Sequence, residues 1–288
     1  MVEYSSGIDW LRVTFIDKNM SVMEVVTDVL GLAFEDFQDN GSFLRYSDSI
    51  TNTEGITIGF NGLSTMGICL DMNGKGLRYY ESVNESYYEN ADELWREFIA
   101  RIAREYPTCN IPRLDLCIDV KSYDDDKEHV RLWQIAKKLE HEELYSLGKF
   151  KNQEVVKKHE GKLKEEGITI YIGNRKNAEF IRMYNKYAES LNKGVYVDES
   201  LSFHERYEIE YKNKKAKAVA NNIINGEKIS DMVLNSLKKV ILFKSKSDKG
   251  KYGEKDAVRR KKFTKWADFT NVERIDMTAI RVIKNIDK

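Results

Sequence analysis

Residues 167–189 constrain the fold of this chain more than any other stretch, because two β-rich runs are joined there by a short turn. β-branched and aromatic residues fill positions 168–172, and a second run of this kind covers positions 179–184. Gly173 and Asn174 lie between the runs and tolerate turn conformations. The pattern therefore predicts a β-hairpin, which belongs to an antiparallel sheet.

The second run carries a candidate nucleophile. Alternation along a strand would place Arg182, Tyr184 and Lys186 on one side of it. A phenol has a reference pKa of about 10, so its attack on phosphorus needs a metal, a base or nearby positive charge. Two neighbouring cations supply such charge. We therefore interpret Tyr184 as a candidate nucleophile toward phosphate, with a structural tyrosine as the plainer alternative, and Tyr171 and Tyr187 as rivals.

The rest of the chain predicts a mixture of strands and helices. Short alternating runs separated by Asn- and Gly-containing turns indicate strands at residues 8–15, 42–46, 56–60, 66–70, 77–81, 113–120 and 206–211. Apolar residues at helical spacing indicate helices at 21–30, 91–105, 127–139, 214–225, 229–240 and 257–266. We expect an α+β fold with extensive antiparallel sheet and flanking helices, in which the order β-α-β-β-β-α occurs in two halves.

This order divides the chain into an N-terminal α+β half at residues 1–111, a catalytic α+β half at 112–212 and a basic helical region at 213–288. The formal net charge is zero, yet residues 211–288 hold 21 basic against 9 acidic side chains. Such asymmetry favours an acidic body and a basic end that contacts DNA, with a solvated lysine-rich surface as the alternative. Tyr252, Phe263 and Trp266 lie among these cations, a composition suited to backbone neutralisation with stacking.

Two of the predicted strands carry paired acids at alternate positions, and each begins with an arginine. The acids are Asp115 and Asp119 on the first strand and Glu208 and Glu210 on the second. If both strands border that of Tyr184, these carboxylates could gather around one Mg²⁺ or Mn²⁺, ions that prefer oxygen ligands. In the alternative interpretation, Arg113 and Arg206 pair with the acids on amphipathic strands.

Several other classes of site are not expected. The four histidines are scattered and form no His-hydrophobic-His motif, although His204 is an optional further ligand. Neither Gly-Lys-Ser nor Gly-Lys-Thr occurs, so ATP hydrolysis is not predicted. The three cysteines lack a CxxC pair, which argues against a zinc site or a disulfide framework. Without a long apolar run or a leader pattern, we expect a cytoplasmic protein that does not enter the membrane.

The hairpin sequence resembles a motif of a known family. The residues YIGNRKN at 171–177 followed by IRMYNK at 181–186 resemble a motif of rolling-circle replication initiators from small Gram-positive plasmids, and of related relaxases of integrative elements. The resemblance extends, in order, to GIDWLRVTF, PRLDLCIDV and RYEIEYKNKKA, and so spans most of the chain. It implies origin-specific nicking and rejoining of one DNA strand by a tyrosine that keeps the 5′-phosphate, and it places that tyrosine at Tyr184.

The same resemblance implies further parts of the machinery. Arg182 and Lys186 would stabilise developing charge, a divalent Mg²⁺ or Mn²⁺ would assist, and the protein would act as a homodimer with the host helicase and polymerase. The side chains expected to contact DNA are Arg175, Lys176, Arg259, Arg260, Lys261 and Lys262. A conjugative relaxase of an integrative element and a non-catalytic DNA-binding regulator on the same scaffold are the alternatives.

Overall fold

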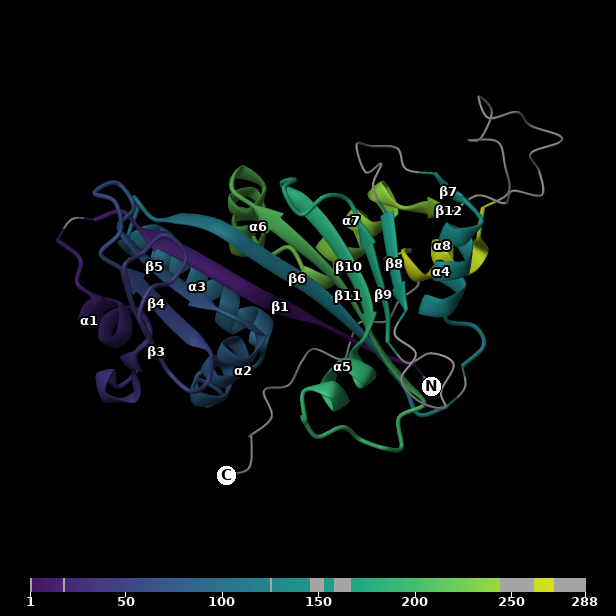
Figure 1. Cartoon of the computed structure of the whole chain (residues 1–288), viewed down its shortest axis with the longest axis horizontal. Helices are drawn as coiled ribbons and strands as arrows, with labels where there is room; N and C mark the ends of the chain where they lie inside the picture. Colours follow the sequence, from purple (N-terminus) through teal and green to yellow (C-terminus); the bar gives the residue numbers. More distant parts are fainter. Residues whose placement is uncertain are drawn as a thin grey trace. The chain divides into compact units, whose positions relative to one another are not determined.

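The computed structural model describes residues 2–17, 19–124, 126–145, 153–157, 167–243 and 262–271 (Figure 1). Its strands are β1 (Val2–Phe15), β2 (Gln38–Asp39), β3 (Asp48–Thr51), β4 (Ile56–Phe60), β5 (Ile68–Met72), β6 (Asn110–Ser122), β7 (Leu144–Tyr145), β8 (Gln153–Lys157), β9 (Ile168–Ile172), β10 (Glu179–Asn185), β11 (Phe203–Lys212) and β12 (Leu242–Phe243). Its α-helices are α1 (Val22–Glu24), α2 (Gly74–Val83), α3 (Ala91–Glu105), α4 (Leu132–Glu140), α5 (Lys186–Asn192), α6 (Lys214–Ile224), α7 (Ile229–Val240) and α8 (Thr264–Phe269).

Most of these strands form one large sheet. Its ten strands follow the order β2-β3-β4-β5-β1-β6-β11-β10-β9-β8, while β7 and β12 pair separately. Every pairing for which a register is given is antiparallel. The predicted α+β class with extensive antiparallel sheet is therefore confirmed. Among the described residues, no helix is long and apolar enough to cross a membrane.

The contacts divide the chain into two compact units. We call the one built around Gly7–Leu116 the N-terminal unit and the one built around Cys117–Ile209 the central unit. Helix α6 belongs to the N-terminal unit, whereas Ser230 and the residues of α7 that follow it, together with α8, belong to the central unit. The segment predicted as one basic C-terminal region thus supplies described residues to both units, and its boundary at residue 213 stays a prediction.

Each half of the chain arranges its strands along the same path. In the first half, β1 pairs with the last strand β5, and β4, β3 and β2 follow outward. In the second half, β6 lies beside the last strand β11, and β10, β9 and β8 follow outward. Both halves thus place their first strand against their last one. This shared order has the form that a duplication of elements would leave, with an additional strand in each half.

Helix α2 corrects the predicted strand at residues 77–81. The Asn73 side chain accepts hydrogen bonds from the backbone N–H groups of Lys75 and Gly76, and so caps a helix that begins at Gly74. Leu77 and Tyr80 then lie on its buried face at helical spacing. The prediction was wrong because the Asn-Gly pair was taken as a hairpin turn, whereas the Asn oxygen starts a helix here.

Two further local predictions need correction. Residues 42–46 form a turn with a single bridge between Phe43 and Tyr46 instead of a strand. Strand β10 ends at Asn185, one residue after Tyr184, because Asn185 caps α5 by accepting a hydrogen bond from the Ala188 N–H at 2.9 Å. Lys186 is therefore the first residue of a helix, and not part of the strand as predicted.

The aromatic residues of α8 belong to the core of the central unit. Trp266 is 1% exposed, its indole N–H donates to the Ile241 carbonyl at 3.0 Å, and its ring lies 5.4 Å from that of Phe243. A buried indole with a satisfied N–H has no face left for a base to stack on. Its predicted role in DNA stacking is therefore wrong, because Trp266 lies with Phe269 on the buried face of α8.

Candidate active site

The hairpin of β9 and β10 positions Tyr184. Register pairs Tyr184 with Thr169 and Arg182 with Tyr171, and Gly173 takes a positive φ of 100° in the turn between the strands. The predicted hairpin is thus confirmed. The Tyr184 side chain is buried, at 5% exposure, and its hydroxyl lies 3.4 Å from Oε2 of Glu208 on β11.

A charged pair lies beside this phenol. Nη2 of Arg182 donates to both carboxylate oxygens of Glu208, at 2.8 and 2.6 Å. The Arg182 guanidinium carbon is also 4.8 Å from the centre of the Tyr184 ring. One carboxylate therefore accepts from the guanidinium and from the phenol. Sequence reasoning treated Glu208 as a metal ligand and missed that it accepts a hydrogen bond from the phenol, which only cross-strand register would have revealed.

Lys186 approaches the same ring from the start of α5. Its Nζ lies 5.7 Å from the Tyr184 ring centre and 2.5 Å from Oε2 of Glu189. Burial alone would raise the pKa of Glu189, but hydrogen bonds from Lys186 and Lys193 hold it below its usual value. The two predicted cations thus both flank Tyr184, although Lys186 reaches it from a helix.

Asp119 forms a second buried cluster in the central unit. Its carboxylate accepts from Arg206 Nε at 2.7 Å and Arg206 Nη2 at 2.8 Å, and it lies 3.0 Å from Nε2 of His204. Burial opposes ionisation, yet Arg206 and His204 hold the pKa of Asp119 well below its usual range. Asp119 is therefore a charged, fully partnered carboxylate, as the amphipathic-strand alternative expects.

The other two predicted ligands lie in the N-terminal unit. Arg113 Nη2 is 2.5 Å from Oδ2 of Asp115 and 3.2 Å from Oε2 of Glu210, so both acids meet one guanidinium. That guanidinium stacks over the Trp10 ring at 4.1 Å. Lys212 adds a second cation to Glu210 at 2.5 Å. Period-two alternation correctly placed these side chains on one face of each strand.

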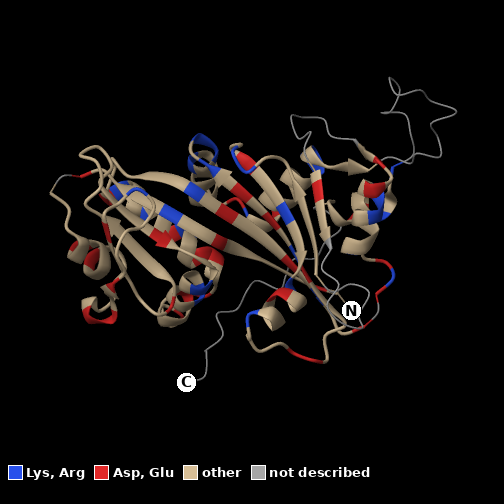
Figure 2. Cartoon of the chain, in the orientation of Figure 1, with Lys and Arg blue, Asp and Glu red and all other residues tan. Residues whose placement is uncertain are grey.

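The four predicted metal ligands are thus arginine-paired. Acidic and basic positions interleave along β6, β10 and β11 (Figure 2). Carboxylate oxygens are the donors that Mg²⁺ and Mn²⁺ prefer, so the chemistry of the residues fits. Within the described ranges, however, no group of three acidic, histidine or cysteine side chains is arranged to hold an ion. Metal binding at these acids stays a prediction.

The remaining predicted residues have varied settings. Tyr171 stacks on Phe180, and Tyr187 is half-buried in α5. Arg175 and Lys176 are exposed in the turn of the hairpin. Lys262 is exposed just before α8, whereas Arg259, Arg260 and Lys261, like Tyr252, lie outside the described residues.

Comparisons with known proteins give consistent results. The family model described as "Replication initiation factor" matches residues 109–288, and that of the "Rolling Circle replication initiation protein N-terminal domain" matches residues 5–101. The putative DNA relaxase NicK of Bacillus subtilis (strain 168) is 23% identical over 248 residues, which cover 83% of this chain and 64% of that protein. The chain therefore spans less than two thirds of the length of this relative.

A solved structure resembles the whole chain. The rolling circle replication initiator protein from Geobacillus stearothermophilus is 26% identical in sequence, with a TM-score of 0.70. The match covers 93% of this chain and 95% of that one. The likeness therefore extends over both units.

Proposed function

The chain belongs to the replication initiation factor family, and we propose that it initiates rolling-circle replication by nicking one strand of an origin. The observation that carries this proposal is the cluster of Tyr184, Arg182 and Glu208 within the motif that resembles the family. A buried phenol beside a carboxylate acceptor and a guanidinium is a suitable arrangement for attack on a phosphodiester.

In the proposed reaction, Tyr184 Oη forms a bond to the scissile phosphorus and the bond from phosphorus to the 3′ oxygen breaks. The phenol proton passes to Glu208, whose oxygen lies 3.4 Å away. The leaving 3′ oxygen takes a proton from solvent and becomes the primer end. The 5′-phosphate stays on the tyrosine, so the reverse attack by a 3′-hydroxyl rejoins the strand.

The flanking cations would act on charge. The cationic groups of Arg182 and Lys186 both lie near the Tyr184 ring, so both can stabilise the phenolate and the phosphate oxygens as negative charge develops. When bound, a Mg²⁺ or Mn²⁺ would polarise the scissile phosphate. Asp119 and Glu208 of the central unit are the predicted carboxylates that would hold it, each in exchange for its arginine partner. We also propose that the protein acts as a homodimer and that the nicked DNA then passes to the host helicase and polymerase.

A covalent-adduct assay tests the chemistry. Supercoiled plasmid carrying the cognate origin is incubated with protein and Mg²⁺ or Mn²⁺, then analysed with and without protease. We expect nicked DNA whose gel shift disappears on proteolysis, with label retained on protein only when the labelled fragment is the one that carries the 5′-phosphate at the nick. Nicking without an adduct would contradict a tyrosine nucleophile, and binding without any nicking would favour the regulator.

A relaxase of an integrative element is the second candidate, because the similarity to NicK covers 83% of this chain. The two functions share the same chemistry and differ in the DNA that they recognise. Nicking at a plasmid replication origin but not at a transfer origin supports the initiator, and the converse preference supports the relaxase.

A further inference from the structure

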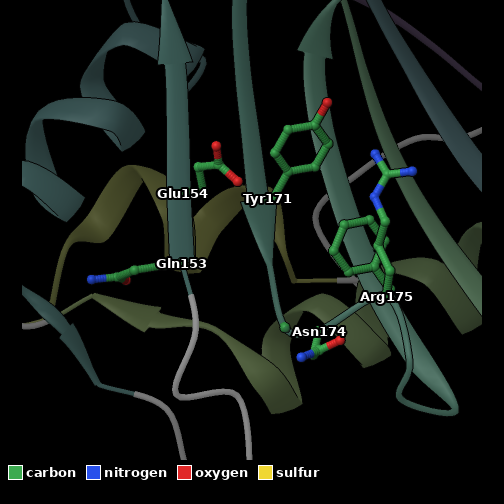
Figure 3. A pocket seen from close by; sticks show the side chains of 7 residues that line it. Gln153, Glu154, Tyr171, Asn174 and Arg175 are labelled. Carbon is green, nitrogen blue, oxygen red and sulfur yellow. The ribbon is translucent and has the colours of Figure 1, made fainter.

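A pocket of about 580 Å³ lies at the turn of the hairpin in the central unit, and the residues that line it are not those used in the proposed reaction. Figure 3 shows Glu154 of β8 and Tyr171 of β9 side by side, with Arg175 of the turn next to them and Asn174 nearby. Gln153 also lines the pocket, but its side chain points away from Tyr171. The volume is in the range of small-ligand sites.

An aromatic pair with a cation forms one wall. The Tyr171 and Phe180 rings are stacked, with centroids 5.7 Å apart and planes at 19°. The Arg175 guanidinium carbon lies 5.3 Å from the centre of each ring. Phe180 is buried within this wall, whereas Tyr171 is half-exposed and Arg175 is exposed, so Tyr171 and Arg175 are the parts accessible to a planar ligand.

The wall shares a strand face with the candidate nucleophile. Phe180, Arg182 and Tyr184 alternate along β10, and register places Tyr171 opposite Arg182. Phe180 and Tyr184 are four positions apart along the strand, which corresponds to about 13 Å. A DNA strand that presents its phosphate to Tyr184 can therefore run along this face toward the pocket.

We propose that the pocket binds an unpaired base of the single DNA strand next to the nick, a site that rests on the proposed function. Aromatic faces and arginine planes stack on any base, whereas a phosphate ion would leave the aromatic wall unused. Arg175 and the following Lys176 supply the positive charge that suits the phosphodiester backbone. Glu154 lies opposite Tyr171 in the register of β8 and β9, and its carboxylate can accept from the amino group of adenine or cytosine.

Binding to single strands tests this site without cleavage. Homopolymeric 16-mers of dA, dC and dT, each with one 2-aminopurine, are titrated against the full chain carrying Tyr184→Phe. Adding Tyr171→Ala should weaken binding by about 5- to 150-fold, the loss of one stacking contact, and should abolish quenching of 2-aminopurine. Tyr171→Phe keeps the ring and should bind within about twofold. Tyr196→Ala is the matched control, because Tyr196 is 89% exposed in a loop of the same unit.

Further variants separate the outcomes. Arg175→Gln changes an exposed turn residue, so it keeps the test valid if Tyr171→Ala does not fold, and it should weaken binding and reduce quenching. Glu154→Ala should remove the preference for dA and dC over dT. Equal affinity and equal quenching in Tyr171→Ala and Tyr196→Ala would overturn the site. If the wild-type protein fails to nick any origin while these binding differences hold, the proposed function falls and the base site stands.

Discussion

At the residue scale, the Glu208 carboxylate and two cations lie beside Tyr184, and the proposed nucleophile is the hydroxyl oxygen of this residue. Tyr184→Phe removes that oxygen and keeps the ring, so we expect no covalent adduct on an origin oligonucleotide while binding stays within a few-fold. Denaturing gels of end-labelled DNA measure the adduct, and anisotropy measures binding. Tyr171→Phe and Tyr187→Phe are the matched controls. If Tyr184→Phe still formed the adduct and Tyr171→Phe did not, the nucleophile would be Tyr171.

Glu208 provides a second residue-scale prediction. Glu208→Gln keeps the shape of the side chain but removes its basicity and its charge pair with Arg182. The loss of a general base typically slows a reaction by about 10²- to 10⁴-fold, so we expect single-turnover nicking to fall by that amount with DNA binding little changed. Glu189→Gln, which changes a carboxylate paired to Lys186, serves as the comparison. Normal metal-dependent rates in Glu208→Gln would remove this residue from the mechanism.

His129 makes a prediction about acid stability. Burial first, then repulsion from Arg131, lowers its pKa to about 3, although Asp126 opposes this. The unfolded chain, with a histidine pKa of about 6.5, therefore binds the proton more readily. Stability from this residue is complete above pH 6.5 and is lost as the pH falls toward 3.

Urea unfolding at pH 7 and pH 5 measures the effect. Between these values we expect the wild-type protein to lose roughly 2 kcal/mol more than His129→Phe. His204, whose pKa burial also lowers, stays in both proteins and cancels in the comparison. An equal loss in both proteins would show that His129 is not the buried neutral group described here.

The sequence predicted side-chain faces better than side-chain partners. Alternation placed Asp115, Asp119, Glu208 and Glu210 correctly relative to their own strands, since the period of a strand is a local property. It did not reveal that Arg182 pairs with Glu208, because this contact joins residues 26 positions apart and depends on register. The candidate nucleophile was found from its motif, whereas the candidate base needed the fold.

At the scale of elements, prediction failed where one local sequence was compatible with both a turn and the start of a helix. The β9–β10 hairpin was predicted correctly because a turn that tolerates positive φ lies between two β-rich runs. Helix α2 was missed because Asn-Gly suits a hairpin turn and a helix start equally well, and the Asn73 cap decided between them. The start of α5 at Lys186 was also missed because of an Asn cap, since Asn185 caps this helix although it is the last residue of a strand.

The cap of α2 gives an element-scale prediction. Asn73→Ala removes the acceptor for two backbone N–H groups and should destabilise the protein by about 1 kcal/mol. For a chain of this size, that corresponds to a fall in Tm of about 2–4 °C by calorimetry. Asn221→Ala, on an exposed position within α6, should leave Tm unchanged or slightly raised. Equal Tm values for the two variants would show that the cap contributes nothing measurable.

At the scale of the whole molecule, the charge asymmetry predicts how binding depends on salt. Neutralising Arg259, Arg260, Lys261 and Lys262 together should weaken duplex binding and flatten the slope of log K against log salt by up to about 0.9 per lost phosphate contact. Loss of phosphate contacts should affect cognate and scrambled duplex alike, whereas loss of base contacts should fall mainly on the cognate one. We expect both effects, with the specific one larger. Unchanged affinity and slope would mean that DNA is held elsewhere.

The strand path shared by the two halves also governs how the chain folds as it is made. The Trp10 indole of β1 donates a hydrogen bond to Asp71 of β5, which is 61 positions away in the sequence. Arg206 of β11 donates one to Asp119 of β6, which is 87 positions away. Closing such long loops is slow, whereas adjacent strands such as β9 and β10 can pair early. During synthesis, the first strand of each half must therefore wait for its last strand to leave the ribosome. Until then its edge is open to association with other chains.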